Sequence, residues 1–241
     1  MWRNSFPCAV VLLFILAASP AFSQGEFYVA TAIPPGVGTK IKSLPYTITS
    51  PGLYYLGGNL SYSAAGYAIT ISANDVVLDL MGFELLGNPA SHGIHVNNNS
   101  VVIRNGAVRG FDTGVSTAWY KYGLHLNNLR AYAGRNGFDL SVNDFASVVG
   151  CDCSGNSEIG VALKAGLVSG CMANANGTGY YIAGAANVLG NSATGNSYRG
   201  FDINSGSANV LMDRNMANGN ANANYAPNNS NAITWGVNAG H

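Results

Sequence analysis

The chain has 241 residues, of which 9% are charged, and its 11 basic and 11 acidic side chains give a formal net charge of zero. This balance excludes a polybasic nucleic-acid-binding surface and an acidic tail, so we expect no nucleic-acid partner. The low charge and the 31 glycines suit a solenoid, in which much of each coil faces inward or stacks on a neighbour.

Residues 1–23 predict a signal peptide. A short positive region is followed by an apolar core over residues 9–19 and by a small-x-small cleavage pattern over residues 21–23. The apolar run is short for a bilayer span, so we expect no membrane span in the mature chain. The prediction is a secreted, periplasmic or cell-surface protein, cleaved near Ser23 and Gln24.

Residues 24–65 predict an N-terminal cap. The strand candidates within it are residues 27–33, 46–48 and 53–56, separated by Pro/Gly turns. A cap is expected because the open end of a solenoid exposes unpaired backbone and apolar surface.

The following segment repeats a unit that opens with a glycine, a large apolar residue, a variable residue and an apolar residue. Its most legible copy, residues 93–112, has the two-residue period of strands and is broken by Asn/Gly/Ser turns, which predicts three short strands and three corners. The copy at Gly114 is weaker because Thr117 takes the last apolar place, and residues 67–71 form a degenerate early copy. The copies begin at Gly93, Gly114, Gly137, Gly160, Gly179 and Gly200.

A column of asparagines spaced by 20 residues supports a repeat of about 20 residues. Its members are Asn136, Asn156, Asn176 and Asn196. Coils that stack about 4.8 Å apart would place these side chains in one ladder at a corner. The leucine framework of leucine-rich repeats and the spacing of helices are both missing. The sequence therefore predicts an all-β, single-domain parallel β-helix of about seven or eight coils.

A resemblance covers residues 40–220. The stretches SLPYTITSPGLYYLGGNL, AITISANDVVLDLMGFELLG and GIHVNNNSVVIRNGAVRGF resemble the right-handed parallel β-helix proteins of the pectate-lyase-like superfamily, above all secreted bacterial repeat proteins without assigned activity. The resemblance implies a right-handed helix, here over residues 66–222, with a C-terminal cap or tail over residues 223–241. It implies no single activity, because the superfamily includes lyases, hydrolases, epimerases, tailspikes and non-catalytic surface proteins.

Three cysteines follow the signal peptide. Cys151 and Cys171 are 20 residues apart and should stack in adjacent coils, and Cys153 keeps the same spacing from Ala173. We expect buried thiols without a metal, because zinc needs about four ligands. A disulfide remains an alternative in an exported protein, although neighbouring parallel strands offer poor bridging geometry.

A functional site is expected on the face formed by the outward residue of each unit. This outward file reads Thr70, His95, Ser116, Asp139, Ala162, Tyr181 and Asp202. Flanking outward positions carry His92, Asn97, Asn136, Lys164, Arg199 and Asn204. The coil at Gly114 adds Trp119, Tyr120, Lys121 and Tyr122, either as an aromatic wall for a sugar chain or as the filling of an irregular coil.

The leading hypothesis is a non-catalytic protein that binds an extended polysaccharide or cell-surface glycan along this face, with no cofactor. Its expected ligand-binding residues are Trp119, Tyr120, Tyr122, Tyr181 and Asp202. A purely structural or adhesive rod is an alternative.

A second alternative is a polysaccharide lyase or epimerase acting on uronate polymers. Its catalytic candidates are Asp139, Lys164, Tyr181, Arg199 and His95, and only this hypothesis calls for calcium, which needs about six to eight oxygen ligands.

Simpler roles compete for the same residues. Asp139 and Lys164 are predicted to form a surface ion pair worth about 0–1 kcal/mol, and Arg199 and Asp202 a second local pair.

Overall fold

The computed structural model describes residues 37–204, 209–227 and 233–240, and every regular element within them is a β-strand. These residues belong to one compact unit, Pro35–His241. The predicted all-β, single-domain fold is therefore confirmed for the described part of the chain. No helix there is long and apolar enough to cross a membrane. The predicted signal peptide over residues 1–23 lies outside the described residues.

One side of the coils is a sheet of nine strands, which we call sheet B. Its strands pair in chain order, and every pairing is parallel. They are β2 (Tyr46–Ile48), β5 (Gly66–Ile71), β8 (Ser91–Val96), β10 (Thr113–Thr117), β12 (Asn136–Leu140), β14 (Ile159–Leu163), β16 (Thr178–Ile182), β19 (Arg199–Ile203) and β22 (Ala223–Pro227).

The other large sheet, sheet A, has twelve strands and is also parallel. Its main path is β1 (Thr39–Ile41), β3 (Gly52–Leu56), β6 (Val76–Asp79), β9 (Val101–Arg109), β11 (Tyr122–Tyr132), β13 (Phe145–Val149), β15 (Gly166–Ser169), β17 (Ala186–Leu189), β20 (Val210–Asp213) and β23 (Ile233–Trp235). The short strands β4 (Leu60–Ser61) and β7 (Glu84–Leu86) join it off this path, and β18 (Ser192–Thr194) pairs with β21 (Met216–Asn218) in a separate small sheet.

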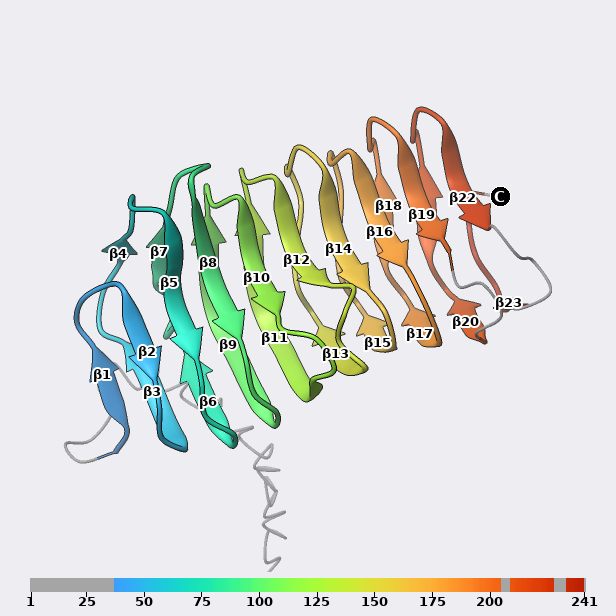
Figure 1. The fold of residues 1–241 in the computed structure, drawn as a ribbon. Helices are drawn as coiled ribbons and strands as arrows, with labels where there is room; N and C mark the ends of the chain where they lie inside the picture. The colour runs from blue at the N-terminus through green and yellow to red at the C-terminus, as the bar shows by residue number, and fades with distance from the viewer. Residues whose placement is uncertain (1–36, 205–208, 228–232, 241) are drawn as a thin grey trace, which may run out of the picture. The chain divides into compact units, whose positions relative to one another are not determined.

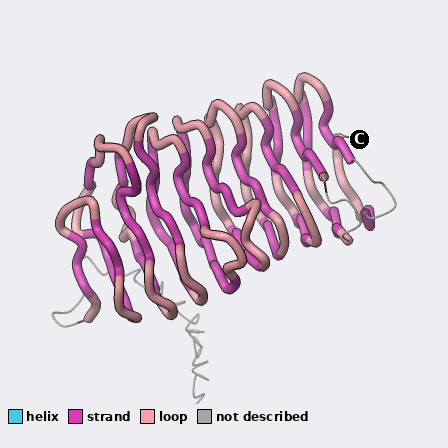
Figure 2. Tube along the Cα trace, viewed as in Figure 1, coloured by secondary structure: helices cyan, strands magenta, loops and turns pink. Residues whose placement is uncertain are grey.

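The chain follows the same circuit in every coil. It passes from a sheet B strand to a sheet A strand, crosses a short third side and returns to sheet B one rung further along (Figure 1). Figure 2 shows the loops gathered at the corners of this circuit. In the first coils β4, β7 and the second halves of β9 and β11 form the third side. In the middle coils single bridges, such as that between Asp152 and Met172, take that place, and β18 and β21 form it later. About eight such turns make a right-handed parallel β-helix, which confirms the predicted fold and number of coils.

The predicted anchor glycines set the register of sheet B. Val115 pairs with Phe138, and Phe138 pairs with Val161, so even the weakest predicted copy lies in line with its neighbours. A Cβ atom on Gly137 would lie 2.5 Å from the carbonyl oxygen of Gly160, and earlier and later anchors approach one another as closely. A side chain at these positions would force adjacent coils apart.

Apolar side chains from both sheets fill the interior in files that run from coil to coil. One sheet B file ends in stacked rings, with centroids 4.8 Å apart between Tyr180 and Phe201 and 5.2 Å apart between Phe201 and Tyr225. The neighbouring file contains Thr117, whose buried hydroxyl group has no hydrogen-bond partner. Stacked rings continue the core, whereas this hydroxyl interrupts it.

The asparagine ladder is present, but its first predicted member is wrong. The N–H of Asn156 donates to Oδ1 of Asn176, and the N–H of Asn176 donates to Oδ1 of Asn196, each over 2.8 Å. Asn136 lies in β12, where its Oδ1 accepts from the N–H of Ile159, 23 residues away. Because that coil is longer than 20 residues, equal spacing in the sequence assigned Asn136 to the wrong column.

A second ladder, which the sequence analysis missed, joins thiols to amides. The N–H of Cys151 donates to Sγ of Cys171 over 3.4 Å, and the N–H of Cys171 donates to Oδ1 of Asn191 over 2.9 Å. Asn191 in turn donates to Oδ1 of Asn215 over 3.0 Å. Cys151 and Cys171 therefore stack in adjacent coils as predicted, and both are free buried thiols, as is Cys153.

Both predicted end segments contribute strands to the large sheets. Residues 46–48 are β2, which pairs with β5, and residues 53–56 lie in β3, which pairs with β6. Residues 233–235 are β23, which pairs with β20. The strand expected over residues 27–33 lies outside the described residues.

Candidate functional site

The predicted outward file on sheet B has the expected register. Each member is the Cα partner of the next from β5 to β19: Thr70, His95, Ser116, Asp139, Ala162, Tyr181 and Asp202. Register puts these side chains on one face, and their contacts decide whether they act together.

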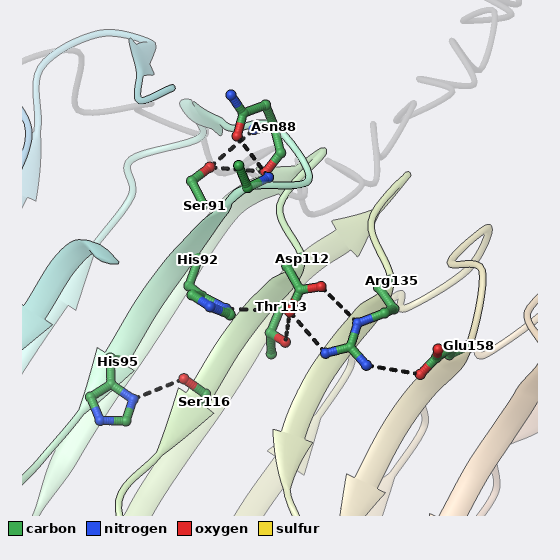
Figure 3. Close-up of polar contacts among 10 residues, drawn as sticks. Asn88, Ser91, His92, His95, Asp112, Thr113, Ser116, Arg135 and Glu158 are labelled. Carbon is green, nitrogen blue, oxygen red and sulfur yellow. Dashed lines mark hydrogen bonds and ion pairs between the residues drawn. The ribbon is translucent and has the colours of Figure 1, made fainter. Parts of the chain in front are cut away.

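His95 contacts side chains of both neighbouring sheet B strands. Its Nδ1 atom lies 2.9 Å from Oγ of Ser116 (Figure 3), and its ring stacks on Tyr67 with the centroids 4.2 Å apart. Burial lowers the pKa of His95, a hydrogen bond to the side chain of Asn97 opposes this effect, and the charge of His92 lowers the pKa further. A neutral imidazole beside a hydroxyl is the first part of an acyl-transfer site, but that chemistry also needs free donors for an oxyanion. Strand N–H groups are committed to the sheet, so we assign the contact to stacking of the coils.

A row of charged side chains, of which only His92 was identified from the sequence, crosses the amino-terminal edge of sheet B (Figure 3). Arg135 donates to Asp112 from Nε over 2.6 Å and from Nη2 over 3.0 Å, and to Glu158 from Nη1 over 3.1 Å. Nδ1 of His92 lies 3.5 Å from Asp112. The hydrogen bonds from Arg135 hold the pKa of Asp112 below its usual range, and they raise the pKa of Arg135. The sequence could have revealed this row, because Asp112 and Glu158 each lie 23 residues from Arg135, which matches the coil length there.

The predicted ion pair between Asp139 and Lys164 is wrong. Nζ of Lys164 donates to Oδ1 of Asp144 over 2.6 Å, whereas Oδ1 of Asp139 accepts from the hydroxyl of Ser141 over 2.6 Å. The corner after β12 brings the carboxylate of Asp144 to the lysine. The sequence of that corner does not repeat in other coils, so its conformation could not be predicted from the repeat.

The remaining catalytic candidates lie in separate groups. Nη1 of Arg199 donates to Oδ2 of Asp202 over 2.8 Å, which confirms the predicted local pair. Tyr181 is the Cα partner of Asp202, and its hydroxyl accepts from Nδ2 of Asn204 over 3.0 Å. His95 belongs to β8, four sheet B strands before β16 in the pairing order, so it does not join this group. The catalytic roles stay predictions.

Four exposed aromatic side chains gather where two neighbouring coils pass from sheet B to sheet A, and we call them the aromatic corner. Their exposed fractions are 66% for Trp119, 68% for Tyr120, 58% for Tyr122 and 64% for Phe145. Tyr122 and Phe145 are Cα partners, and the ring centroids of Trp119 and Tyr120 are 6.0 Å apart. Such exposure means that these rings do not fill the interior of an irregular coil. Phe145 was not identified from the sequence.

The loops that carry the aromatic corner are braced against each other. Nζ of Lys164 lies 5.5 Å from the ring centroid of Tyr120 and 2.6 Å from Oδ1 of Asp144. The N–H of Asp144 donates to the carbonyl oxygen of Lys121 over 2.8 Å. These contacts join three successive coils, and they support the ring of Tyr120.

A hollow of about 460 Å³ adjoins the aromatic corner on the outer face of sheet A. Gly123, Gly166 and Ala185 are small residues of its lining, and Phe145 forms part of its wall. Its polar members are His125, Ser147, Asn187 and Asn209. The hollow therefore lies one corner away from the sheet B face on which the sequence analysis expected the site.

Calcium, which only the lyase hypothesis called for, would need several oxygen ligands around one point. Within the described ranges, no three His, Cys, Asp or Glu side chains form a group that would hold a metal ion. Asp144, the carboxylate at the aromatic corner, is engaged by Lys164.

No protein-family model matches the chain, and no curated protein matches it. Among solved structures, the chain is similar to the crystal structure of pectate lyase Pel9A, with 18% sequence identity, 88% of this chain and 73% of that chain covered, and a TM-score of 0.48. By its own sheets and register, this chain is a right-handed parallel β-helix, the fold that the resemblance to the pectate-lyase-like superfamily implies.

Proposed function

We propose that the protein binds an extended polysaccharide at the aromatic corner and along the adjoining hollow, without converting it chemically. The observation that carries this proposal is the aromatic corner itself, with four side chains exposed by 58% to 68% on adjacent coils. A contiguous apolar patch on a protein surface marks a binding site more often than chance. Pyranose rings present C–H groups to the negative face of an aromatic ring, so such a patch suits a sugar chain.

The hollow supplies a direction for the ligand. It runs across β11, β13, β15 and β17, which at the strand spacing of a sheet is roughly 14 Å along the stack. Its volume of about 460 Å³ lies in the range of ligand-binding sites. His125, Ser147 and Asn187 offer hydrogen-bonding groups to sugar hydroxyls. These features favour a polymer that lies along the stack.

The predicted ligand-binding residues divide between two surfaces. Trp119, Tyr120 and Tyr122 belong to the aromatic corner, whereas Tyr181 and Asp202 lie on the sheet B face, where contact with a ligand stays a prediction.

The lyase alternative gains no support of its own from the contacts. Lys164 and Arg199, its candidate bases, are each held by a carboxylate.

The test measures retention of the purified protein by a panel of polysaccharides, in affinity electrophoresis and pull-down. The combined substitution Trp119→Ala and Phe145→Ala should weaken binding at least tenfold, about 1.4 kcal/mol, because it removes two of the four rings. Tyr198→Ala is the matched control, since Tyr198 is 45% exposed but precedes β19 at the other edge of sheet B. Thermal unfolding of each variant checks that the fold is intact.

Failure to bind any polysaccharide, or equal binding by wild type and the double variant, would overturn the proposal and leave the structural hypothesis. The same samples are assayed for unsaturated sugar products. Product that disappears in Lys164→Ala would replace the binding function with a lyase function.

A further inference from the structure

We infer that the polysaccharide taken by the hollow is uncharged, built from neutral pyranose rings and not from uronates; this inference rests on the proposed function. The polar groups of the lining are an imidazole, a hydroxyl and two amides, from His125, Ser147, Asn187 and Asn209. Among the described residues that line it there is no lysine, arginine or carboxylate. These groups match sugar hydroxyls as donors and acceptors. A ligand carboxylate leaving water for this lining would need a cation as its partner.

Lys164, one of the two lysines at the aromatic corner, is already matched by a carboxylate. Nζ of Lys164 lies 2.6 Å from Oδ1 of Asp144 and over the ring of Tyr120. Recruiting this lysine to a uronate would leave Asp144 without its partner and would withdraw support from the ring. The energy gained by the new pair would be offset by the pair that is lost.

The arginines of the described ranges are likewise paired with carboxylates. Every arginine in them lies within 3.9 Å of a carboxylate: Arg104, Arg109, Arg130, Arg135, Arg199 and Arg214. The surface therefore offers no row of free guanidinium groups to a polyanion.

Lys121 is the one lysine of the aromatic corner for which the described contacts give no ion pair, and it does not line the hollow. A polyuronate carries one carboxylate on each ring, so a chain lying over several rungs brings several charges. This one lysine can meet one of them, and any other carboxylate that turns toward the lining would lose water without compensation.

The experiment compares two polymers that differ only in charge: polygalacturonate and the same polymer after reduction of its carboxyl groups. Neutral β-glucan and mannan extend the panel to other linkages. The inference predicts that neutral polymers bind at least tenfold more tightly than polygalacturonate. It also predicts that neutral binding changes less than about twofold between low salt and about 0.5 M salt, because no ion pair is being screened.

Two variants at an exposed lining position sharpen the comparison. Ala185→Lys adds a cation to the hollow and should raise the affinity for polygalacturonate several-fold, with little gain for the neutral polymer. Ala185→Gln has similar length without the charge and should leave the affinity for polygalacturonate as it is.

The outcomes separate the inference from the proposed function. Tighter binding of polygalacturonate that weakens with salt, and that the Trp119→Ala and Phe145→Ala substitutions abolish, would overturn the inference while the binding function stands. An unchanged response to polygalacturonate in Ala185→Lys would also overturn it, since the ligand would not then lie in the hollow. Failure of every polymer to bind would overturn the proposed function itself.

Discussion

At the scale of single residues, the hydroxyl of Thr117 is a defect in an otherwise apolar file. It is buried without a hydrogen-bond partner, at a position where the other units carry leucine, valine or isoleucine. Thr117→Val keeps the shape and removes the desolvated hydroxyl, so we expect the free energy of unfolding in urea to rise by about 1 kcal/mol. Thr70→Val, on the outward file, is the control and should change stability by less than about 0.5 kcal/mol. A loss of stability in Thr117→Val would mean that the hydroxyl has a partner.

We expect His95 to make the folding stability of the protein depend on pH. Its pKa is lowered from the ordinary 6.5, chiefly by burial, so the unfolded chain takes up the proton first as the pH falls. The stability contributed by the neutral ring is therefore kept above pH 6.5 and lost as the pH falls below it. Thermal unfolding between about pH 7.5 and pH 5 should show a decrease in Tm that is smaller in His95→Gln. An equal decrease in both proteins would assign the effect to other groups.

The sequence could not predict which side chains would contact each other. The register placed Asp139 one rung from the coil of Lys164, but the lysine reaches Asp144 in the corner between them. The register of the strands follows from the alternation of apolar and polar residues, which is visible in the sequence. The corners differ in length and conformation from coil to coil, so their side-chain contacts do not follow from it. Phe145 was missed for the same reason, because it stands at the end of such a corner.

At the scale of elements, the thiol–amide ladder suggests a stabilising substitution. Nδ2 of Asn191 donates to the carbonyl oxygen of Val168 over 3.0 Å, and Sγ of Cys171 makes the corresponding but longer contact to Val148, 3.5 Å. Cys171→Asn would replace a weak donor and acceptor with an amide in a place that the next coil already fills with asparagine. We expect a gain of about 1 kcal/mol in urea unfolding.

The control for this ladder is Cys171→Ala. It removes the acceptor of the Cys151 N–H and should lower stability by about 1–3 kcal/mol, because a buried donor is left unmatched. If Cys171→Asn were the less stable of the two, the amide would not fit the corner and the equivalence of the columns would fail.

Elements were predictable where packing restricts the residue type. Anchor glycines face the carbonyl oxygen of the next anchor, so no other residue fits, and their columns could be followed through coils of unequal length. The asparagine at position 136 lacked such a restriction, and regular spacing alone placed it in the wrong ladder. The second ladder consists of cysteines followed by asparagines, so no single residue type recurs along its column and the sequence did not reveal it.

At the scale of the whole molecule, each coil touches only its neighbours, so stability should fall toward the ends of the described helix. Hydrogen exchange should therefore be slowest in β12 to β17 and fastest in β1, β2 and β23, each of which has a strand on one side only or lies near such an edge. Mass spectrometry of exchanged peptides measures this profile. Uniform protection from end to end would show that the stack unfolds as one cooperative block.

The way in which the hollow is assembled has a further consequence. Each rung of sheet A adds one short segment to its floor, and neighbouring segments are joined by parallel backbone pairing. Duplication of a coil such as that of β14 and β15 would therefore extend the trough by about 4.8 Å and keep the aromatic end in place. Under the proposed function, duplication or loss of coils would therefore change the length of polymer that the protein can bind in steps of one coil.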